Sequence, residues 1–215
     1  MAQTPRAAEL RTAWRDLAGP GAAVLGEELI ARYAEPHRHY HDTRHLAAVL
    51  DLVDTLAQHA DDPRAVRFAA WYHDAVYDPT RLDNEEHSAL LAETELPALG
   101  ARPAFVQEVA RLVRLTATHD PAPHDRNGAV LCDADLAILA APPDEYAAYA
   151  AAIREEYAHL PENEFRAGRA AVLRRLLDRP VLFHTRYGQE RFENRARANL
   201  GTELTLLAAG GICGP

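Results

Sequence analysis

Apolar residues recur at intervals of three and four along almost the whole chain, and this spacing constrains the fold more than any other feature. It is typical of amphipathic helices, whereas the strict alternation typical of half-buried strands is absent. Prolines and glycines interrupt the pattern at short intervals, as expected where helices begin and end. We therefore predict an all-α fold of about ten helices in one bundle. The fourth predicted helix covers about 63–77, and the last covers about 188–208.

Length and composition exclude several classes of protein. A chain of 215 residues without a clear internal boundary predicts one domain over 1–215. The net charge of −9 argues against nucleic-acid polymers and membranes as partners. All 23 basic residues are arginine, which excludes lysine Schiff-base chemistry, and the only serine, Ser88, lacks the surroundings of a hydrolase nucleophile. With neither a secretory core nor an apolar run of membrane-spanning length, we expect a soluble cytoplasmic protein.

Three apolar helical segments carry strongly hydrated groups where the pattern predicts core residues. His73 and Asp74 adjoin in AAWYHDAVYD, His45 heads HLAAVLDLV, and Asp135 interrupts AVLCDADLAILA. Burial of such groups is costly unless they are paired or bound to a metal. Because adjacent helical residues point about 100° apart, His73 and Asp74 can flank one ion. The sequence thus indicates a metal site with nitrogen and oxygen ligands.

The order of these elements, H…HD…D, makes the chain resemble the HD-domain metal-dependent phosphohydrolase superfamily. The segments RHYHDTRH, WYHDAVYDPTRLDNEEHSA and DADLAIL are similar to a bacterial branch of predicted HD phosphohydrolases. The resemblance implies an all-helical domain with a metal core at about 38–140 and C-terminal helices at about 142–208 packing on it. It also implies the metal ligands His45, His73, Asp74 and Asp135, with Asp74 acting in catalysis as well.

Two of these ligand assignments involve a choice between neighbours. The family's first ligand has an apolar residue four positions later, which fits His45 with Val49 but does not fit His41. The aspartate directly before an apolar residue matches the family position, which favours Asp135 over Asp133. His41 then contacts substrate or a ligand, and Asp133 is a candidate for orienting a metal-bound histidine.

These ligand types suit a divalent metal without fixing its identity, because manganese, iron, cobalt, nickel, zinc and magnesium all accept them. Such a metal activates water for attack on a phosphate ester. We expect Glu85, with Glu86 as its rival, to be the acid–base residue, although both also suit an ordinary helix N-terminus. Because guanidinium and imidazole groups bind phosphate, the predicted substrate contacts are Arg38, His41, Arg81 and His119.

The predicted function is hydrolysis of a phosphomonoester or phosphodiester in a small, nucleotide-like substrate. One alternative is a di-iron oxygenase of the HD type, in which His87 and His119 hold a second metal, although a surface position is favoured for His87. The other alternative is a non-catalytic, metal-stabilised module that binds a nucleotide or a partner protein. The sequence does not decide the substrate, the number of metals, or whether the chain forms a homo-oligomer.

Overall fold

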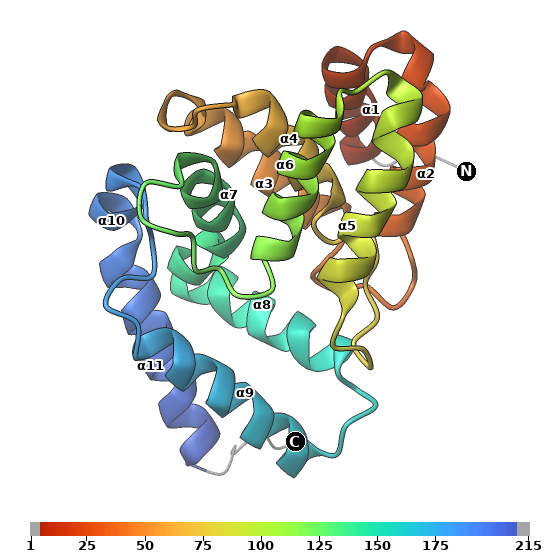
Figure 1. The fold of residues 1–215 in the computed structure, drawn as a ribbon. Helices are drawn as coiled ribbons and strands as arrows, with labels where there is room; N and C mark the ends of the chain where they lie inside the picture. The colour runs from red at the N-terminus through yellow and green to blue at the C-terminus, as the bar shows by residue number, and fades with distance from the viewer. Residues whose placement is uncertain (1–4, 210–215) are drawn as a thin grey trace. The chain divides into compact units, whose positions relative to one another are not determined.

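The computed structural model describes residues 5–209, and within this range it contains helices and no β-strand. This confirms the all-α prediction. The described range holds eleven α-helices (Figure 1), which are α1 Pro5–Ala18, α2 Ala23–Tyr33, α3 Thr43–Thr55, α4 Pro63–Tyr72, α5 Asn84–Glu95, α6 Pro103–Leu115, α7 Arg126–Leu136, α8 Pro143–Glu156, α9 Glu162–Leu177, α10 Arg186–Arg191 and α11 Glu193–Ala208. None of the described helices is both long enough and apolar enough to span a lipid bilayer.

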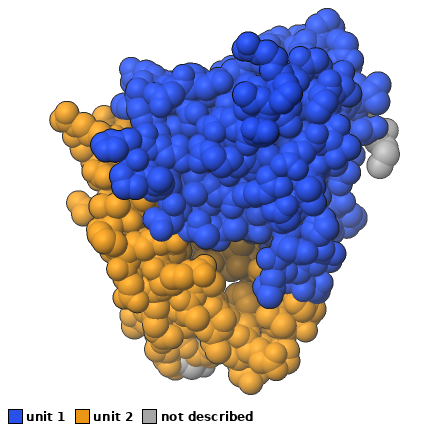
Figure 2. All heavy atoms as spheres, in the orientation of Figure 1, with its two compact units in different colours: residues 1–134 blue, residues 135–215 orange. Residues whose placement is uncertain are grey.

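The chain divides into two compact units, residues 1–134 and 135–215, which Figure 2 shows in different colours. The boundary falls inside α7, so Asp135 begins the second unit although it continues a helix that starts in the first. One domain over 1–215, with C-terminal helices packing on the metal core, stays a prediction.

In the first unit, α4 packs against α1, α3, α5 and α6. Its buried residues Phe68 and Trp71 both meet Trp14 of α1 edge-on, with ring centroids 5.7 and 5.0 Å apart. On α2, a Cβ added at Gly26 would come within 2.3 Å of the Trp14 ring, so this contact requires glycine. The large aromatic rings thus fix α1, α2 and α4 against one another.

Helix α4 ends at Tyr72, so the prediction of a helix through about residue 77 was wrong. The cause is that backbone groups beyond Tyr72 bond to side chains from elsewhere in the unit. The hydroxyl of Ser88, on α5, accepts from the Val76 N–H at 3.0 Å and donates to the Val76 carbonyl at 3.2 Å. Consequently His73 and Asp74 lie on a turn at the end of α4 rather than inside the helix.

In the second unit, α11 packs against α9 and against a short 3₁₀ turn, Ala137–Ala140. The buried amide of Asn199 donates to the carbonyl oxygens of Leu139 and Ala141 at 2.8 and 2.9 Å, which fixes this turn on α11. The buried aliphatic side chains of the unit, including Leu173 and Leu200, complete the core.

The last predicted helix is divided into α10 and α11 by a break at Phe192. The Phe192 ring packs against Phe183, with centroids 5.3 Å apart. The Glu193 carboxylate accepts from the backbone N–H groups of Leu182 and Phe183 at 2.9 and 3.1 Å. These tertiary contacts interrupt a segment whose local pattern favours one continuous helix.

Candidate metal centre

Three side chains that the sequence assigns to a metal come together in the structure. His45, His73 and Asp135 each offer one ligand atom, and these atoms all lie within 4.8 Å of one another. His45 is in the first turn of α3, whose N-cap, Asp42, accepts from the His45 N–H. His73 follows the last residue of α4, and Asp135 is near the end of α7. Within the described part of the chain this is the one group of its kind, and its geometry can hold a metal ion.

Asp74 lies against the same two imidazoles. Its Oδ2 is 3.1 Å from Nε2 of His73 and 3.5 Å from Nε2 of His45, and the two Nε2 atoms are 3.0 Å apart. Ligand atoms held about 2.1 Å from one ion at angles near 90–110° stand about 3.0–3.4 Å from one another. Since the separations in this cluster match that spacing, the residues present fit a bound divalent metal.

The orientation of His73 suits metal binding through Nε2. Its Nδ1 lies 2.8 Å from the carbonyl oxygen of Ala70, to which an Nδ1–H would donate. This bond places the proton on Nδ1 and leaves the Nε2 lone pair facing His45 and Asp74. A backbone carbonyl of α4 therefore selects the tautomer that a metal requires.

The electrostatics of the cluster favour an ionised carboxylate. The side chains of His73 and Asp74 are 1% and 14% exposed. Burial raises the pKa of the Asp74 carboxyl, but the charges of His73 and His41 and hydrogen bonds with the two cluster histidines outweigh it and hold that pKa well below its usual range. The Asp74 carboxyl is therefore ionised across the neutral pH range.

The side chain of Arg38 makes different contacts from the predicted contact with a substrate phosphate. Its side chain is fully buried, and it donates to the carbonyl oxygens of Asp74, His41 and Ala75 at 2.7, 3.0 and 3.3 Å. A guanidinium enclosed in this manner is not available to a phosphate, so the predicted substrate contact is replaced by a structural one. Arg38 joins the loop before α3 to the turn that carries His73 and Asp74.

Tyr33 and Ser88 hold the same turn, and this role was not predicted from the sequence for either residue. The Tyr33 hydroxyl accepts from the Asp74 N–H and donates to the Trp71 carbonyl, both at 3.2 Å. Burial raises the pKa of Tyr33 to about 12, so the phenol stays protonated and able to donate. The only available signal was a hydroxyl on an otherwise apolar helical stripe, which is weak.

The two candidate acid–base residues differ in their surroundings. The Glu86 carboxylate accepts from Nε and Nη2 of Arg114 at 2.7 and 2.8 Å, and this pairing lowers the Glu86 pKa. Glu85 is half-buried, and among the described residues its carboxylate makes no hydrogen bond or ion pair. Of the two carboxylates, Glu85 is therefore the one that is not already paired with another described residue.

Three further predicted residues lie around or outside the cluster. The His41 ring is 5.7 Å from that of His45 and 4.3 Å from that of Tyr77, so it adjoins the metal-binding group. Arg81 donates twice to Asp83, at 2.9 Å each, in an exposed loop. His119, which has a left-handed backbone with φ of 50°, lies outside the metal-binding group.

Asp133, the alternative to Asp135, and His87, the possible ligand of a second metal, are also outside the metal-binding group. Asp133 is fully buried, whereas Asp135 is the aspartate that reaches the histidines. His87 is 43% exposed and bonds to Asp83 at 3.2 Å, as the surface interpretation predicts. Two imidazoles and the carboxylate of Asp135 thus form the group, and the carboxylate of Asp74 lies against the two imidazoles, a set of donors that suits several divalent metals. Comparison with protein-family models, with curated proteins and with solved structures gave no significant match to this chain.

Proposed function

We propose that the chain is a metal-dependent phosphohydrolase of the HD-domain type, acting on a phosphomonoester or phosphodiester. The observation that carries the proposal is that His45, His73 and Asp135 bring ligand atoms within 4.8 Å of one another, with the Asp74 carboxylate against the two imidazoles. A bound divalent metal supplies an activated water and stabilises negative charge on the phosphoryl oxygens. The order of these residues along the chain, which is that of the HD pattern, supports the same proposal.

The chain's own residues have distinct tasks in this proposal. His73, with its proton fixed on Nδ1 by Ala70, presents a lone pair from Nε2. Asp74, ionised at neutral pH, offsets the charge of the metal and orients the attacking water. Glu85, whose carboxylate has no competing ion pair among the described residues, exchanges a proton with that water or with the leaving group. His41, beside His45, contacts a phosphate oxygen.

The proposed substrate is a small, nucleotide-like phosphate ester. A net charge of −9 disfavours long anionic polymers, which need a basic track. Arg81 and His119 remain proposed substrate contacts, and Arg81 would exchange its bonds with Asp83 for bonds to a phosphate. The di-iron alternative ranks lower because neither His87 nor His119 belongs to the metal-binding group.

The decisive experiment measures metal content and phosphate release together. The purified chain is stripped with EDTA, reloaded separately with manganese, cobalt, nickel, zinc, iron or magnesium, and tested on nucleoside 5′-monophosphates, 4-nitrophenyl phosphate and bis(4-nitrophenyl) phosphate. We expect one metal per chain, and hydrolysis that Asp74→Asn abolishes. The matched control, His87→Gln, removes an imidazole outside the metal-binding group and should keep both metal and activity.

Other outcomes of this experiment would favour another function or contradict the proposed site. Two irons per chain, with one lost in His87→Gln, would favour the oxygenase. Stoichiometric metal binding without phosphate release from any ester would favour the non-catalytic module. Full metal content and activity in Asp74→Asn would contradict the site assignment itself.

A further inference from the structure

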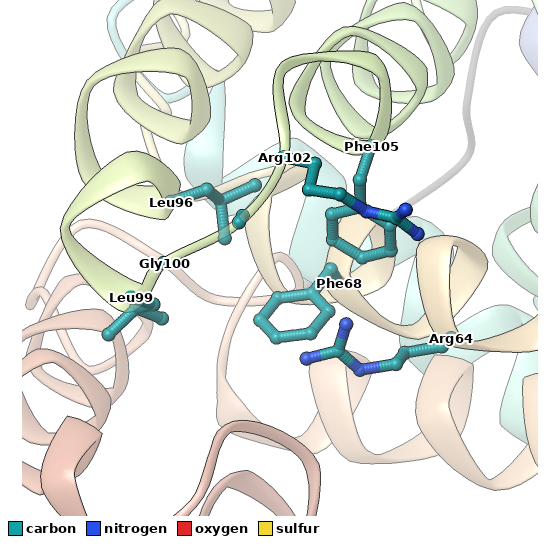
Figure 3. A pocket seen from close by; sticks show the side chains of 8 residues that line it. Arg64, Phe68, Leu96, Leu99, Gly100, Arg102 and Phe105 are labelled. Carbon is teal, nitrogen blue, oxygen red and sulfur yellow. The ribbon is translucent and has the colours of Figure 1, made fainter.

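A pocket opens at the end of α4 that is opposite to His73. It has a volume of about 140 Å³ and lies among α4, α6 and the segment between α5 and α6. Its lining includes Arg64, Phe68, Leu96, Leu99, Arg102 and Phe105, and no acidic residue (Figure 3). Because α4 rises about 1.5 Å per residue, roughly 13 Å of helix separates Arg64 from His73. The pocket is therefore separate from the metal centre.

The guanidinium of Arg64 is held in this pocket by aromatic faces. Its Cζ lies 5.0 Å from the ring centroid of Phe68 and 5.0 Å from that of Phe105. The two rings meet edge-to-face, with centroids 5.5 Å apart. Cation–π contact fixes the position of a guanidinium without using its N–H donors. Arg64 therefore presents pre-positioned donors to the pocket.

Arg102 brings a second guanidinium to the same place. Gly100 ends the 3₁₀ turn Leu96–Leu99 in a left-handed conformation, with φ of 75°, and turns the chain toward α6. Arg102 follows as the N-cap of α6, and Figure 3 shows its side chain running beside Phe105. Two cationic side chains, from α4 and from the start of α6, thus border one small cavity.

Neither guanidinium is neutralised by an acidic side chain in the part of the chain that the structure describes. Among the described residues, Arg64 and Arg102 make no side-chain hydrogen bond and no ion pair. The acids nearest in sequence to Arg64 are engaged elsewhere, since Asp61 bonds to Arg126 and Asp62 caps α4 by accepting from Ala65. In a chain with a net charge of −9, two cations in a pocket lined by no acidic residue create a local positive potential.

We propose that this pocket binds the dianionic phosphate of a small organic phosphomonoester, at a site distinct from the metal centre. Two guanidinium groups balance two negative charges, whereas a carboxylate would be satisfied by one. The apolar lining, chiefly Leu99 and Phe105, packs against the organic part of the ligand. The pocket is smaller than most ligand sites, so it suits the phosphate and its first attached group.

The test uses phenylphosphonate, a dianionic phosphomonoester analogue with no P–O ester bond to hydrolyse. Calorimetric titration at pH 8, with EDTA present to keep the metal centre from binding the probe, measures its Kd on the full chain. Arg64→Gln and Arg102→Gln are each expected to weaken binding about tenfold. The matched control, Arg67→Gln, makes the same charge change on α4 at a residue paired with Asp54, and should keep Kd within about twofold.

The outcomes separate this proposal from the function proposed above, because the measurement needs neither metal nor turnover. No binding of phenylphosphonate at about millimolar concentration would overturn it. Equal weakening by Arg67→Gln would also overturn it, since it would reduce the effect to overall charge. Benzoate, a monoanion of similar shape, should bind more weakly, and equal binding would refute the dianion argument. Unchanged thermal unfolding of Arg64→Gln, Arg102→Gln and Arg67→Gln confirms that the three variants are folded.

Discussion

The guanidinium of Arg38 donates to the carbonyl oxygen of Asp74 at 2.7 Å, from a side chain that is completely buried. This bond ties the loop before α3 to the turn that presents the proposed ligands. It also satisfies a carbonyl that would otherwise belong to a continuing helix. The position of Asp74 therefore depends on a residue that is distant in sequence. Substitution of Arg38 tests this dependence.

Arg38→Gln should weaken both the fold and the metal site. Loss of a buried cation that has several carbonyl partners is expected to cost about 2–4 kcal/mol of unfolding free energy. Metal affinity should fall about 10- to 100-fold because the ligand turn is no longer held. Urea unfolding and metal titration of the folded protein measure the two effects. The control Arg44→Gln, at a 73% exposed side chain, should change neither, and wild-type metal affinity in Arg38→Gln would contradict the positioning role.

Asp135→Asn and Asp133→Asn should separate a ligand from its buried neighbour. An amide is a poor substitute for a carboxylate ligand, so Asp135→Asn should lower metal affinity more than about 100-fold. Asp133 is fully buried and lies outside the metal-binding group, so Asp133→Asn should chiefly lower stability, by about 1–3 kcal/mol. Metal titration by calorimetry gives the ranking, and the reverse order would assign the site to Asp133.

Metal binding should stabilise the folded chain. A ligand that binds only the native state at 100 times its Kd adds about 2.7 kcal/mol to the free energy of unfolding. For a chain of this size that raises Tm by about 5–10 °C. Scanning calorimetry with and without EDTA measures the shift. The shift should vanish in Asp74→Asn, whose own Tm without metal serves as the reference, and a shift retained there would place the metal elsewhere.

Arg111 should make stability depend on acid pH. It donates to Glu108 at 2.8 Å and to Asp125 at 2.7 Å. Its bonds to Glu108 lower that carboxyl's pKa, while for Asp125 burial raises the pKa and the bonds from Arg111 and the Gly128 N–H outweigh it. Lowered carboxyl pKa values stabilise the fold at neutral pH, and this stabilisation is lost as pH falls through them, below about pH 4.

Accordingly, Arg111→Gln should lose about 0.5–1 kcal/mol at pH 7, a small value because the side chain is partly exposed and screened by solvent. The difference between wild type and variant should shrink toward zero near pH 3. Urea unfolding at pH 7, 5 and 3 measures it. A difference that is constant across this range would mean that the two carboxyl groups are not coupled to Arg111.

The helical pattern predicted the fold class because each helix has a local signal. The apolar stripe starting at Leu46, with an acidic cap before it, defines α3 without information from the rest of the chain. The end of α4 could not be predicted in this manner, because Arg38, Tyr33 and Ser88 replace the helical hydrogen bonds after Tyr72. The break at Phe192 has the same cause, since its contacts come from residues 182–183.

The sequence predicted the proposed metal ligands better than it predicted the residues that surround them. The choice of His45 over His41 and of Asp135 over Asp133 depended on the resemblance to the HD pattern, and the metal-binding group contains the two predicted residues. The predicted role of Arg38 was wrong because the sequence pattern around an arginine is the same whether its guanidinium faces a phosphate or backbone carbonyls. Only tertiary structure distinguishes these two environments.

The turn after Tyr72 has a kinetic consequence. Its shape depends on side chains from α2, α5 and the loop before α3, so the ligand atoms converge only after these segments have docked. A metal would then bind late on the folding pathway, after the rate-limiting step. It should slow unfolding while leaving the rate of folding almost unchanged. The metal would then increase kinetic stability without accelerating folding.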